Sequence, residues 1–145
     1  MIVPDANLLI YAYDSTSPHH RASIAWWEGV LSGVEPVGIP WVVVLAFTRI
    51  LTHPRVVNEP LEPREVRERV DQWLTLDHVR LLNPGPNSVS LFFDFLEEAG
   101  IGGNLSTDAL IAVIAKEYGA VVHSNDRDFD RFSGLKWINP LEAKS

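Results

Sequence analysis

The sequence predicts a three-layer α/β/α fold around a mostly parallel sheet of four to five strands. Short β-like segments alternate with longer segments of helical periodicity along the chain. Such alternation places parallel strands in one sheet and helices on both of its faces. The 145 residues, of which 46% are hydrophobic, are enough for one domain with a sizeable core, so residues 1–145 are expected to form a single domain.

The expected strands are short apolar runs of β-like composition. They lie at residues 1–4, 37–39, 79–82 and 120–123, and residues 135–138 form a possible edge strand. The expected helices have apolar positions three and four residues apart, with proline, serine or glycine at their ends. They lie around residues 8–11 and at 20–31, 41–52, 63–76, 88–99 and 109–119, and a short helix ends near residue 134.

Composition excludes several functional classes. The chain has no cysteine, which excludes a disulfide scaffold, a thiolate nucleophile and a cysteine-ligated zinc site. No apolar run approaches the roughly 20 residues of a membrane span, and no basic region precedes an apolar one at the N-terminus. We therefore expect a cytoplasmic protein without membrane contact. The net charge of −7 argues against a generic nucleic-acid binder, but it suits a protein that gathers carboxylates around a divalent cation.

Three aspartates occupy similar positions relative to the expected elements. Asp5 follows the first strand, Asp126 follows the strand at 120–123, and Asp108 is expected to cap the helix at 109–119 together with Ser106 and Thr107. Ligands of open α/β sheets bind outside the carboxyl ends of the strands, so these acids are expected to meet there. The alternative is that all of them are ordinary helix caps, a role for which aspartate is well suited.

A metal site is the second interpretation of these carboxylates, and their spacing alone leaves it open beside the caps. Like charges at short range repel each other, so some of these acids must protonate unless a cation neutralises them. Donors that are all carboxylate oxygens suit Mg²⁺ or Mn²⁺ better than zinc. Such a site can orient a water, lower its pKa and neutralise a phosphoryl oxygen, which is the chemistry of phosphodiester hydrolysis.

Three motifs resemble those of a known family. DANLLIYAYD begins at Asp5, GGNLSTDALIAVIAKEYGA surrounds Asp108 and SNDRDFDRF surrounds Asp128. Their order and spacing resemble the PIN-domain nucleases and, more narrowly, the VapC-type toxins of bacterial toxin–antitoxin pairs. The resemblance implies a magnesium-dependent endoribonuclease that is inhibited by a cognate VapB-type antitoxin, which also binds DNA.

The resemblance also implies roles for individual residues. Asp5 and Asp108 match acids that bind the metal directly, and Asp126 matches a third metal-site acid, whose contact with the metal can pass through a water. Asp128 matches a further acid that often accompanies them; a solvated acid at a helix start is its alternative. Polar residues that support the site are matched by Asn7 and Ser124.

One position departs from the family pattern. PIN nucleases usually carry a glutamate on the helix after the second strand, but this chain has Ala46 there, before Phe47. Either the site works with fewer acids or another acid reaches it, and the candidates are Glu59, Glu62 and Asp94. The number of metal ions, one or two, stays open.

Two arginines are candidates for RNA contacts. The segment 41–52 is apolar nearly all round, which predicts a buried helix, and Arg49 is its one charged residue. A buried arginine needs a partner, so we expect a salt bridge between Arg49 and a site carboxylate, with phosphate binding as the alternative. Arg55 lies in the loop after this helix, where it either contacts RNA or is solvated.

The tryptophans of the helical segments are expected in the core or in a homodimer interface, rather than stacked on bases. These residues are Trp26, Trp27, Trp41 and Trp73. A homodimer through these helices is therefore predicted, and the specificity for RNA would come from RNA shape or from a groove of the dimer.

Two other functions compete with the nuclease. In the first, the acids are only caps, and the protein binds RNA or its antitoxin without turnover. In the second, the chain is a phosphoacceptor receiver domain, which also uses aspartates at strand ends. A receiver needs a lysine at a late strand end, and Lys116, Lys136 and Lys144 do not occupy such a position.

Overall fold

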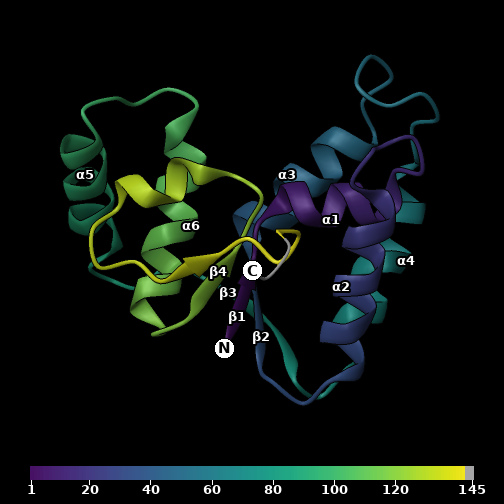
Figure 1. Ribbon diagram of the computed structural model, residues 1–145, viewed down its shortest axis with the longest axis horizontal. Coiled ribbons are helices and arrows are strands. Elements are labelled where there is room, and N and C mark those ends of the chain that lie inside the picture. Colours follow the sequence, from purple (N-terminus) through teal and green to yellow (C-terminus); the bar gives the residue numbers. More distant parts are fainter. Residues whose placement is uncertain (143–145) are drawn as a thin grey trace.

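The computed structural model describes residues 1–142, and a parallel five-stranded sheet lies at its centre. The strand order is β3-β2-β1-β4-β5, so the chain moves outward from β1 in one direction and then returns to build β4 and β5 on the other side (Figure 1). The strands are β1 (Ile2–Pro4), β2 (Val37–Pro40), β3 (Val79–Leu82), β4 (Val121–His123) and β5 (Trp137–Ile138). The predicted edge strand is confirmed as β5.

Helices cover both faces of the sheet, as the alternating pattern predicted. Figure 1 shows α1 to α4 on one side of the sheet and α5 and α6 on the other. The helices are α1 (Ala6–Tyr13), α2 (His20–Ser32), α3 (Trp41–Leu51), α4 (Pro63–Leu74), α5 (Ser88–Ala99) and α6 (Leu105–Glu117), followed by the short 3₁₀ helix η1 (Arg127–Arg131). The three-layer α/β/α fold is therefore confirmed.

The core is apolar on both sides of the central strands. Val3 of β1, Ile39 of β2 and Val122 of β4 are fully buried, because helices cover both faces of the strands that carry them. In the register of the sheet, Ile2 of β1 is paired with Val37 of β2 on one side and with Val121 of β4 on the other. The sheet thus fixes the relative height of the carboxyl ends of β1 and β4.

An aromatic cluster holds α1, α2, α3 and α4 together. Trp73 is 1% exposed, and its ring centroid lies 5.0 Å from that of Phe47, 5.4 Å from that of Trp27 and 5.9 Å from that of Tyr13. The Trp73 Nε1 also donates a hydrogen bond of 2.9 Å to the hydroxyl of Tyr13. We call these four residues the aromatic cluster. It confirms a core position for Trp27 and Trp73.

Helix α3 is less buried than its composition predicted. Trp41 is 53% exposed, Leu45 and Arg49 are exposed as well, and these residues follow one another at intervals of four along a single stripe. Arg49 forms no salt bridge with any carboxylate of residues 1–142, so the predicted ion pair is wrong. The reason is that α3 lies in an outer layer, where one face always meets solvent, even when its residues are apolar.

Helix α6 begins earlier than predicted. Its first residue is Leu105, which is buried, and the amides of Leu105 and Ser106 bond back to the carbonyls of Gly102 and Gly103. Asp108 is therefore inside the first turn rather than at the cap, and its predicted role as a cap is wrong. Burial of Leu105 draws the helix start toward the core and carries Asp108 with it.

Helices long and apolar enough to cross a bilayer do not occur in residues 1–142.

Candidate metal centre

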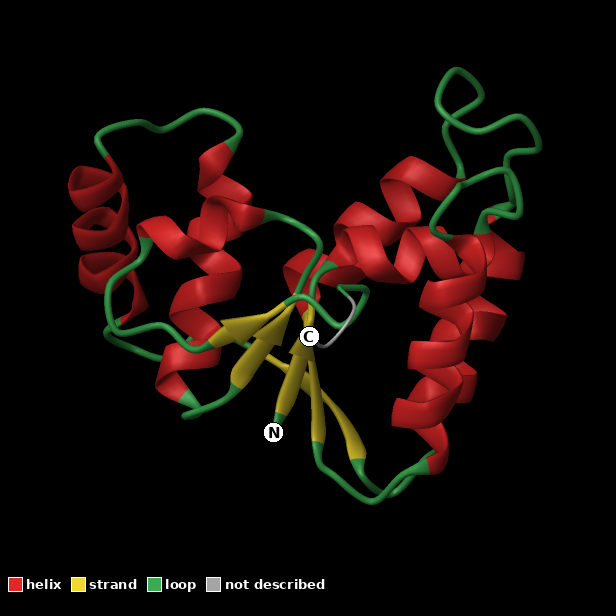
Figure 2. Cartoon of the chain, in the orientation of Figure 1, coloured by secondary structure: helices red, strands yellow, loops and turns green. Residues whose placement is uncertain are grey.

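The candidate site lies where β1 and β4 end, at the point where the strand order reverses. Figure 2 shows the strand arrowheads converging between the two groups of helices. The amide of Asp5, directly after β1, donates a hydrogen bond of 2.9 Å to the carbonyl of His123, the last residue of β4. This bond joins the ends of the two neighbouring strands. Ligands of parallel sheets bind at such a reversal point, because the connections leave it in opposite directions.

Asp5 is the deepest acid of the site. It is 6% exposed and caps α1, since its Oδ1 accepts a hydrogen bond of 2.7 Å from the amide of Ala6. Its Oδ2 accepts a second one, of 2.6 Å, from the hydroxyl of Ser124. Burial raises the pKa of Asp5 to about 6; the bonds from Ser124 and Ala6 oppose the rise, and the charge of Asp126 adds to it.

Ser124 ties the two strand ends together. Its side chain is fully buried, and its hydroxyl hydrogen is committed to Asp5. The same oxygen accepts from the amide of Asp126 at 2.9 Å and from Nδ2 of Asn7 at 3.4 Å. One hydroxyl therefore positions the first turn of α1 and the start of η1 relative to each other, which agrees with the supporting role that the sequence resemblance implied for Asn7 and Ser124.

The turn after β4 brings two further acids to the site. Asp126 caps η1, because its Oδ1 accepts a hydrogen bond of 2.9 Å from the amide of Asp128. Asp128 lies in the first turn of η1, and its Oδ1 is 3.3 Å from the Nε of Arg131. The side chains of both acids are consequently held on the same side of a short helix.

Asp108 reaches the site from the opposite layer. Helix α6 packs on η1, and its first turn presents Asp108 to the strand ends. The pKa of Asp108 is raised to about 7, first by burial and then by the charges of Asp5, Asp126 and Asp128. Of the three aspartates first singled out from the sequence, Asp5 and Asp126 do cap helices, whereas Asp108 does not.

Three of these acids have the spacing of a metal site. One carboxylate oxygen from each of Asp108, Asp126 and Asp128 lies within 4.8 Å of the others, and each residue is half-buried. We call these three residues the acid cluster. All-oxygen donors at this spacing fit a divalent cation such as Mg²⁺ or Mn²⁺. Such a cation would relieve the repulsion that, after burial, raises the pKa of Asp108.

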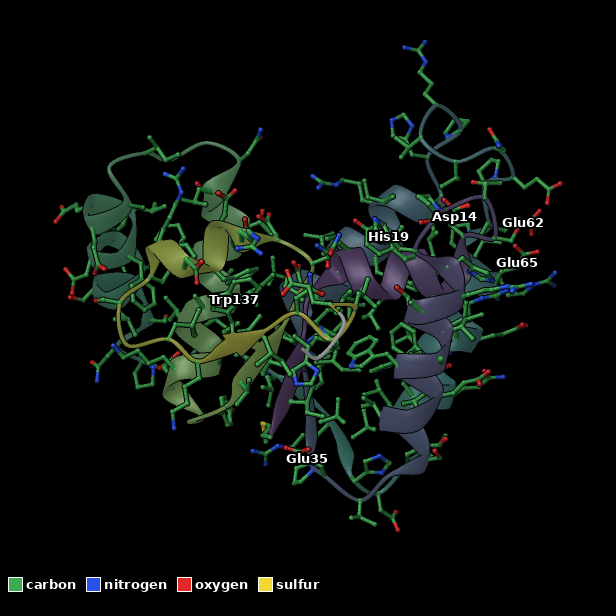
Figure 3. The ribbon with its side chains drawn as sticks, in the orientation of Figure 1. Asp14, His19, Glu35, Glu62, Glu65 and Trp137 are labelled. Atoms are coloured by element: carbon green, nitrogen blue, oxygen red, sulfur yellow. The ribbon has the colours of Figure 1, made fainter. Side chains whose placement is uncertain are left out.

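Most predicted acids meet, but no substitute for the missing glutamate joins them. Asp5 lies behind the acid cluster rather than within it, and Ala46 is half-buried on α3. Glu62 forms a capping box at the start of α4, and Figure 3 shows it on the outer side of the α1–α4 layer, away from the strand ends. Glu59 lines a separate cavity beside Tyr13, and Asp94 is an exposed residue of α5; within residues 1–142 neither belongs to the acid cluster.

One charged residue at the site was missed from the sequence. Arg131 contacts Asp128 from three positions further along η1, a spacing that brings side chains together on a helix. The signal was present as the D-F-D-R run within the short helix expected to end near Gly134, but the pairing of Asp128 with Arg131 was not considered. Arg49 and Arg55 are both exposed and have no carboxylate partner in the described part of the chain.

Comparison with known proteins agrees with this geometry. The profile of the family described as "PIN domain" matches residues 2–135. The chain belongs to the PIN-domain family. The resemblance proposed from the sequence motifs is therefore confirmed over nearly the whole length of the domain, including the segments that carry all four aspartates.

Two relatives of this PIN domain come from Mycobacterium tuberculosis. "Ribonuclease VapC33" is 38% identical over 141 residues, which cover 97% of this chain and 99% of the relative. "Ribonuclease VapC37" is 39% identical over 140 residues, which cover 97% of both chains. The match thus extends from end to end in both proteins.

Solved structures show the same PIN fold at lower identity. VapC20 of Mycobacterium tuberculosis, described as a toxin that cleaves the sarcin-ricin loop, superposes with a TM-score of 0.69 at 14% identity and covers 94% of this chain and 99% of its own. The VapBC2 structure from Rickettsia felis, bound to a DNA fragment from its promoter, gives a TM-score of 0.68 at 18% identity and covers 96% of this chain and 98% of that one. At these identities the likeness establishes the fold.

Proposed function

We propose that this PIN domain is a metal-dependent endoribonuclease and the toxin of a toxin–antitoxin pair. The observation that carries the proposal is the acid cluster, whose carboxylate oxygens lie within 4.8 Å of one another at the carboxyl edge of the sheet. Relatives named as VapC ribonucleases, which match almost the full chain at 38% identity and above, support the same activity.

Asp108, Asp126 and Asp128 would hold the divalent cation, Mg²⁺ or alternatively Mn²⁺. When bound, the cation supplies positive charge that stabilises a phosphoryl oxygen and lowers the pKa of a water. Asp108 must lose its proton for this, so cation affinity is expected to rise as the pH passes through its pKa of about 7.

Asp5 contributes in a different way from the acid cluster. Its two oxygens already accept hydrogen bonds from Ser124 and Ala6, which fix the carboxylate rigidly at the floor of the site. We propose that Asp5 would add negative charge to the site and would be a further ligand of the cation. Rigid placement matters because a small misplacement of a catalytic group can cost about a hundredfold in rate.

RNA would approach from the solvent side, where Arg49 and Arg55 are candidate contacts. Trp41, Val44 and Thr48 of α3 line a cavity of about 340 Å³ on the side of α4. Arg49 does not line this cavity; it is exposed and forms no ion pair within residues 1–142, so its guanidinium could bind phosphate. Arg55 is exposed in the loop between α3 and α4. Both contacts belong to the proposal.

A VapB-type antitoxin is the proposed protein partner. The solved neighbours include toxin–antitoxin assemblies, among them VapBC-1 from nontypeable Haemophilus influenzae with a TM-score of 0.68. A homodimer also stays part of the proposal. Exposed apolar residues on α3 (Trp41 and Leu45) and on α5 (Val89 and Phe93) offer surface for it, and light scattering at high concentration would give a dimer mass.

RNA cleavage with purified protein tests the proposed activity. With Mg²⁺ the wild-type protein should cut total RNA, EDTA should stop the reaction, and Asp108→Asn should lower the rate about a hundredfold or more because a ligand charge is lost. Asp77→Asn is the matched control, since Asp77 is exposed and precedes β3 at the opposite edge of the sheet. A folded wild-type protein that cuts nothing, or an Asp108→Asn variant that cuts equally well, contradicts the proposal.

The alternative function is binding of RNA or antitoxin without turnover. The observation in its favour is Ala46, for which no acid among residues 1–142 substitutes in the cluster. Calorimetric titration with Mg²⁺ or Mn²⁺ separates the two functions. Binding that is lost in Asp108→Asn supports the nuclease, whereas absence of binding in the wild type supports the alternative.

A further inference from the structure

We propose that Arg131 binds a phosphate of the RNA substrate at the rim of the acid cluster. This inference rests on the proposed nuclease function, since it names a substrate contact of the same site. It assigns to Arg131 a role that neither the motif comparison nor the helix pattern suggested.

Arg131 is placed at the site by a direct contact with Asp128. Its Nε lies 3.3 Å from Oδ1 of Asp128, which is itself a member of the acid cluster. Within residues 1–142 this is the one salt bridge that involves an acid of the cluster. The guanidinium is therefore held next to the place where a phosphate would have to sit in order to react.

The contact leaves most of the guanidinium unused. A guanidinium has five N–H donors in a planar fork, and the ion pair with Asp128 involves only the Nε side. The terminal nitrogens of Arg131 take part in no hydrogen bond within the described part of the chain, and the Arg131 side chain is 46% exposed. The parallel N–H donors of a guanidinium match the oxygens of a phosphate.

Electrostatics explains why such a group is needed there. An RNA phosphate that approaches the acid cluster meets several carboxylates, and a bound divalent cation offsets only part of their charge. Several other cations have partners elsewhere: Arg127 pairs with Glu142 at 3.2 Å, while Arg69, Arg80 and Lys116 lie over aromatic rings. Arg131 adds positive charge at the rim without leaving Asp128.

A purely structural role for Arg131 makes a different prediction. If Arg131 only positions Asp128, its loss should weaken metal binding and leave the affinity for RNA unchanged. If it binds phosphate, its loss should weaken RNA binding and leave the affinity for the metal nearly unchanged. The two roles can be separated because RNA binding can be measured without cleavage, with Ca²⁺ in place of Mg²⁺.

The experiment measures binding of a short fluorescein-labelled single-stranded RNA by anisotropy in Ca²⁺, at several salt concentrations. Arg131→Gln is expected to raise Kd about tenfold and to reduce the slope of log Kd against log salt by about 0.7. Arg131→Lys should recover part of the affinity because it keeps the charge but loses the fork. Arg127→Gln is the matched control, with the same change of charge in the same short helix, and should shift Kd less than twofold.

Calorimetry with Mn²⁺ on the same variants completes the test, with an expected change in metal affinity below threefold for Arg131→Gln. Equal losses of RNA affinity in Arg131→Gln and Arg127→Gln, or a loss confined to metal affinity, would overturn the inference. Absence of RNA binding by the wild-type protein would overturn it as well. If the wild type binds RNA but does not cut it in Mg²⁺, the proposed activity fails while the role of Arg131 is still decided by the binding data.

Discussion

The aromatic cluster and the acid cluster are built alike but have opposite effects on stability. Each brings together side chains from separate segments of the chain, and each is partly or fully removed from water. In the aromatic cluster the rings contact one another at centroid distances of 5.0 to 5.9 Å and share a hydrogen bond. In the acid cluster the neighbours are like charges, and the pKa of Asp108 is raised to about 7, first by burial and then by the charges of the neighbouring acids.

The aromatic cluster stabilises the fold, whereas the acid cluster does not. Burial of aromatic surface is among the largest favourable contributions that a side chain makes to folding. Clustered carboxylates lower stability in the absence of a cation, so the acid cluster does not contribute to folding as the aromatic cluster does. The following substitutions test this contrast, beginning with the largest expected effect.

Trp73→Ala should destabilise the protein by about 3–5 kcal/mol, because it leaves a large cavity and removes the partner of the Tyr13 hydroxyl. Trp41→Ala is the control, since Trp41 is 53% exposed and should cost less than about 1 kcal/mol. Urea unfolding followed by circular dichroism measures both values. Similar values for the two variants would show that the aromatic cluster does not hold the helical layer.

Ser124→Ala should destabilise the protein by about 1–3 kcal/mol at neutral pH, because the buried carboxylate of Asp5 loses its side-chain donor. Ser32→Ala removes an exposed hydroxyl that bonds to the carbonyl of Glu28 and should cost less than about 0.5 kcal/mol. The same urea unfolding experiment measures the free energy of unfolding of both variants. An equal effect of the two substitutions would mean that Ser124 does not anchor the deep acid.

Asp108→Asn should act in the opposite direction and stabilise the protein in EDTA. The pKa of Asp108 is about 7 in the folded state against 3.8 in the unfolded chain, so ionisation opposes folding. The wild type therefore loses stability relative to the variant as the pH rises from about 4 to about 7. With allowance for screening at this part-exposed group, the gain of the variant above pH 7 is about 1–2 kcal/mol.

The pH dependence of this difference is the informative measurement. His123, whose pKa is lowered to about 4 mainly by burial, gives the opposite trend, but it is common to both proteins and cancels. Thermal unfolding at several pH values, with and without Mg²⁺, gives the comparison. A difference that does not change between pH 4 and pH 8 in EDTA would show that Asp108 is not under strain from its neighbours.

Much of the fold could be predicted from local sequence. Strands such as Val79–Leu82 and helices such as Ser88–Ala99 have clear periodicity and clear boundaries, and both were predicted with the observed limits. Predictions failed where the position of a helix in the fold determines which of its residues are buried. The apolar composition of α3 suggested a buried helix, but its position in an outer layer exposes Trp41 and Arg49.

The candidate site was predictable as a set of residues but not as a geometry. Sequence alone placed Asp5 and Asp126 at strand ends, because a short apolar run followed by an acid is a local pattern. It could not rank these acids by depth, since depth depends on what packs over them. The sequence also predicted that Asp108 caps the helix. In the structure the buried Leu105 begins α6 earlier, so Asp108 lies in the first turn and is close to the other acids.

Local composition and motif spacing are enough to predict the alternation of strands and helices, the family and the identity of the acids. Tertiary structure decided the rest. The parallel pairing of β1 and β4 brings Asp5 and Asp126 together across more than a hundred residues of chain, and the packing of α6 adds Asp108. Only there do the burial of Asp5 and Asp108 and their distances to neighbouring charges become defined, and with them the raised pKa values of these two acids. The reason is that desolvation and electrostatic energy depend on position in space rather than along the chain.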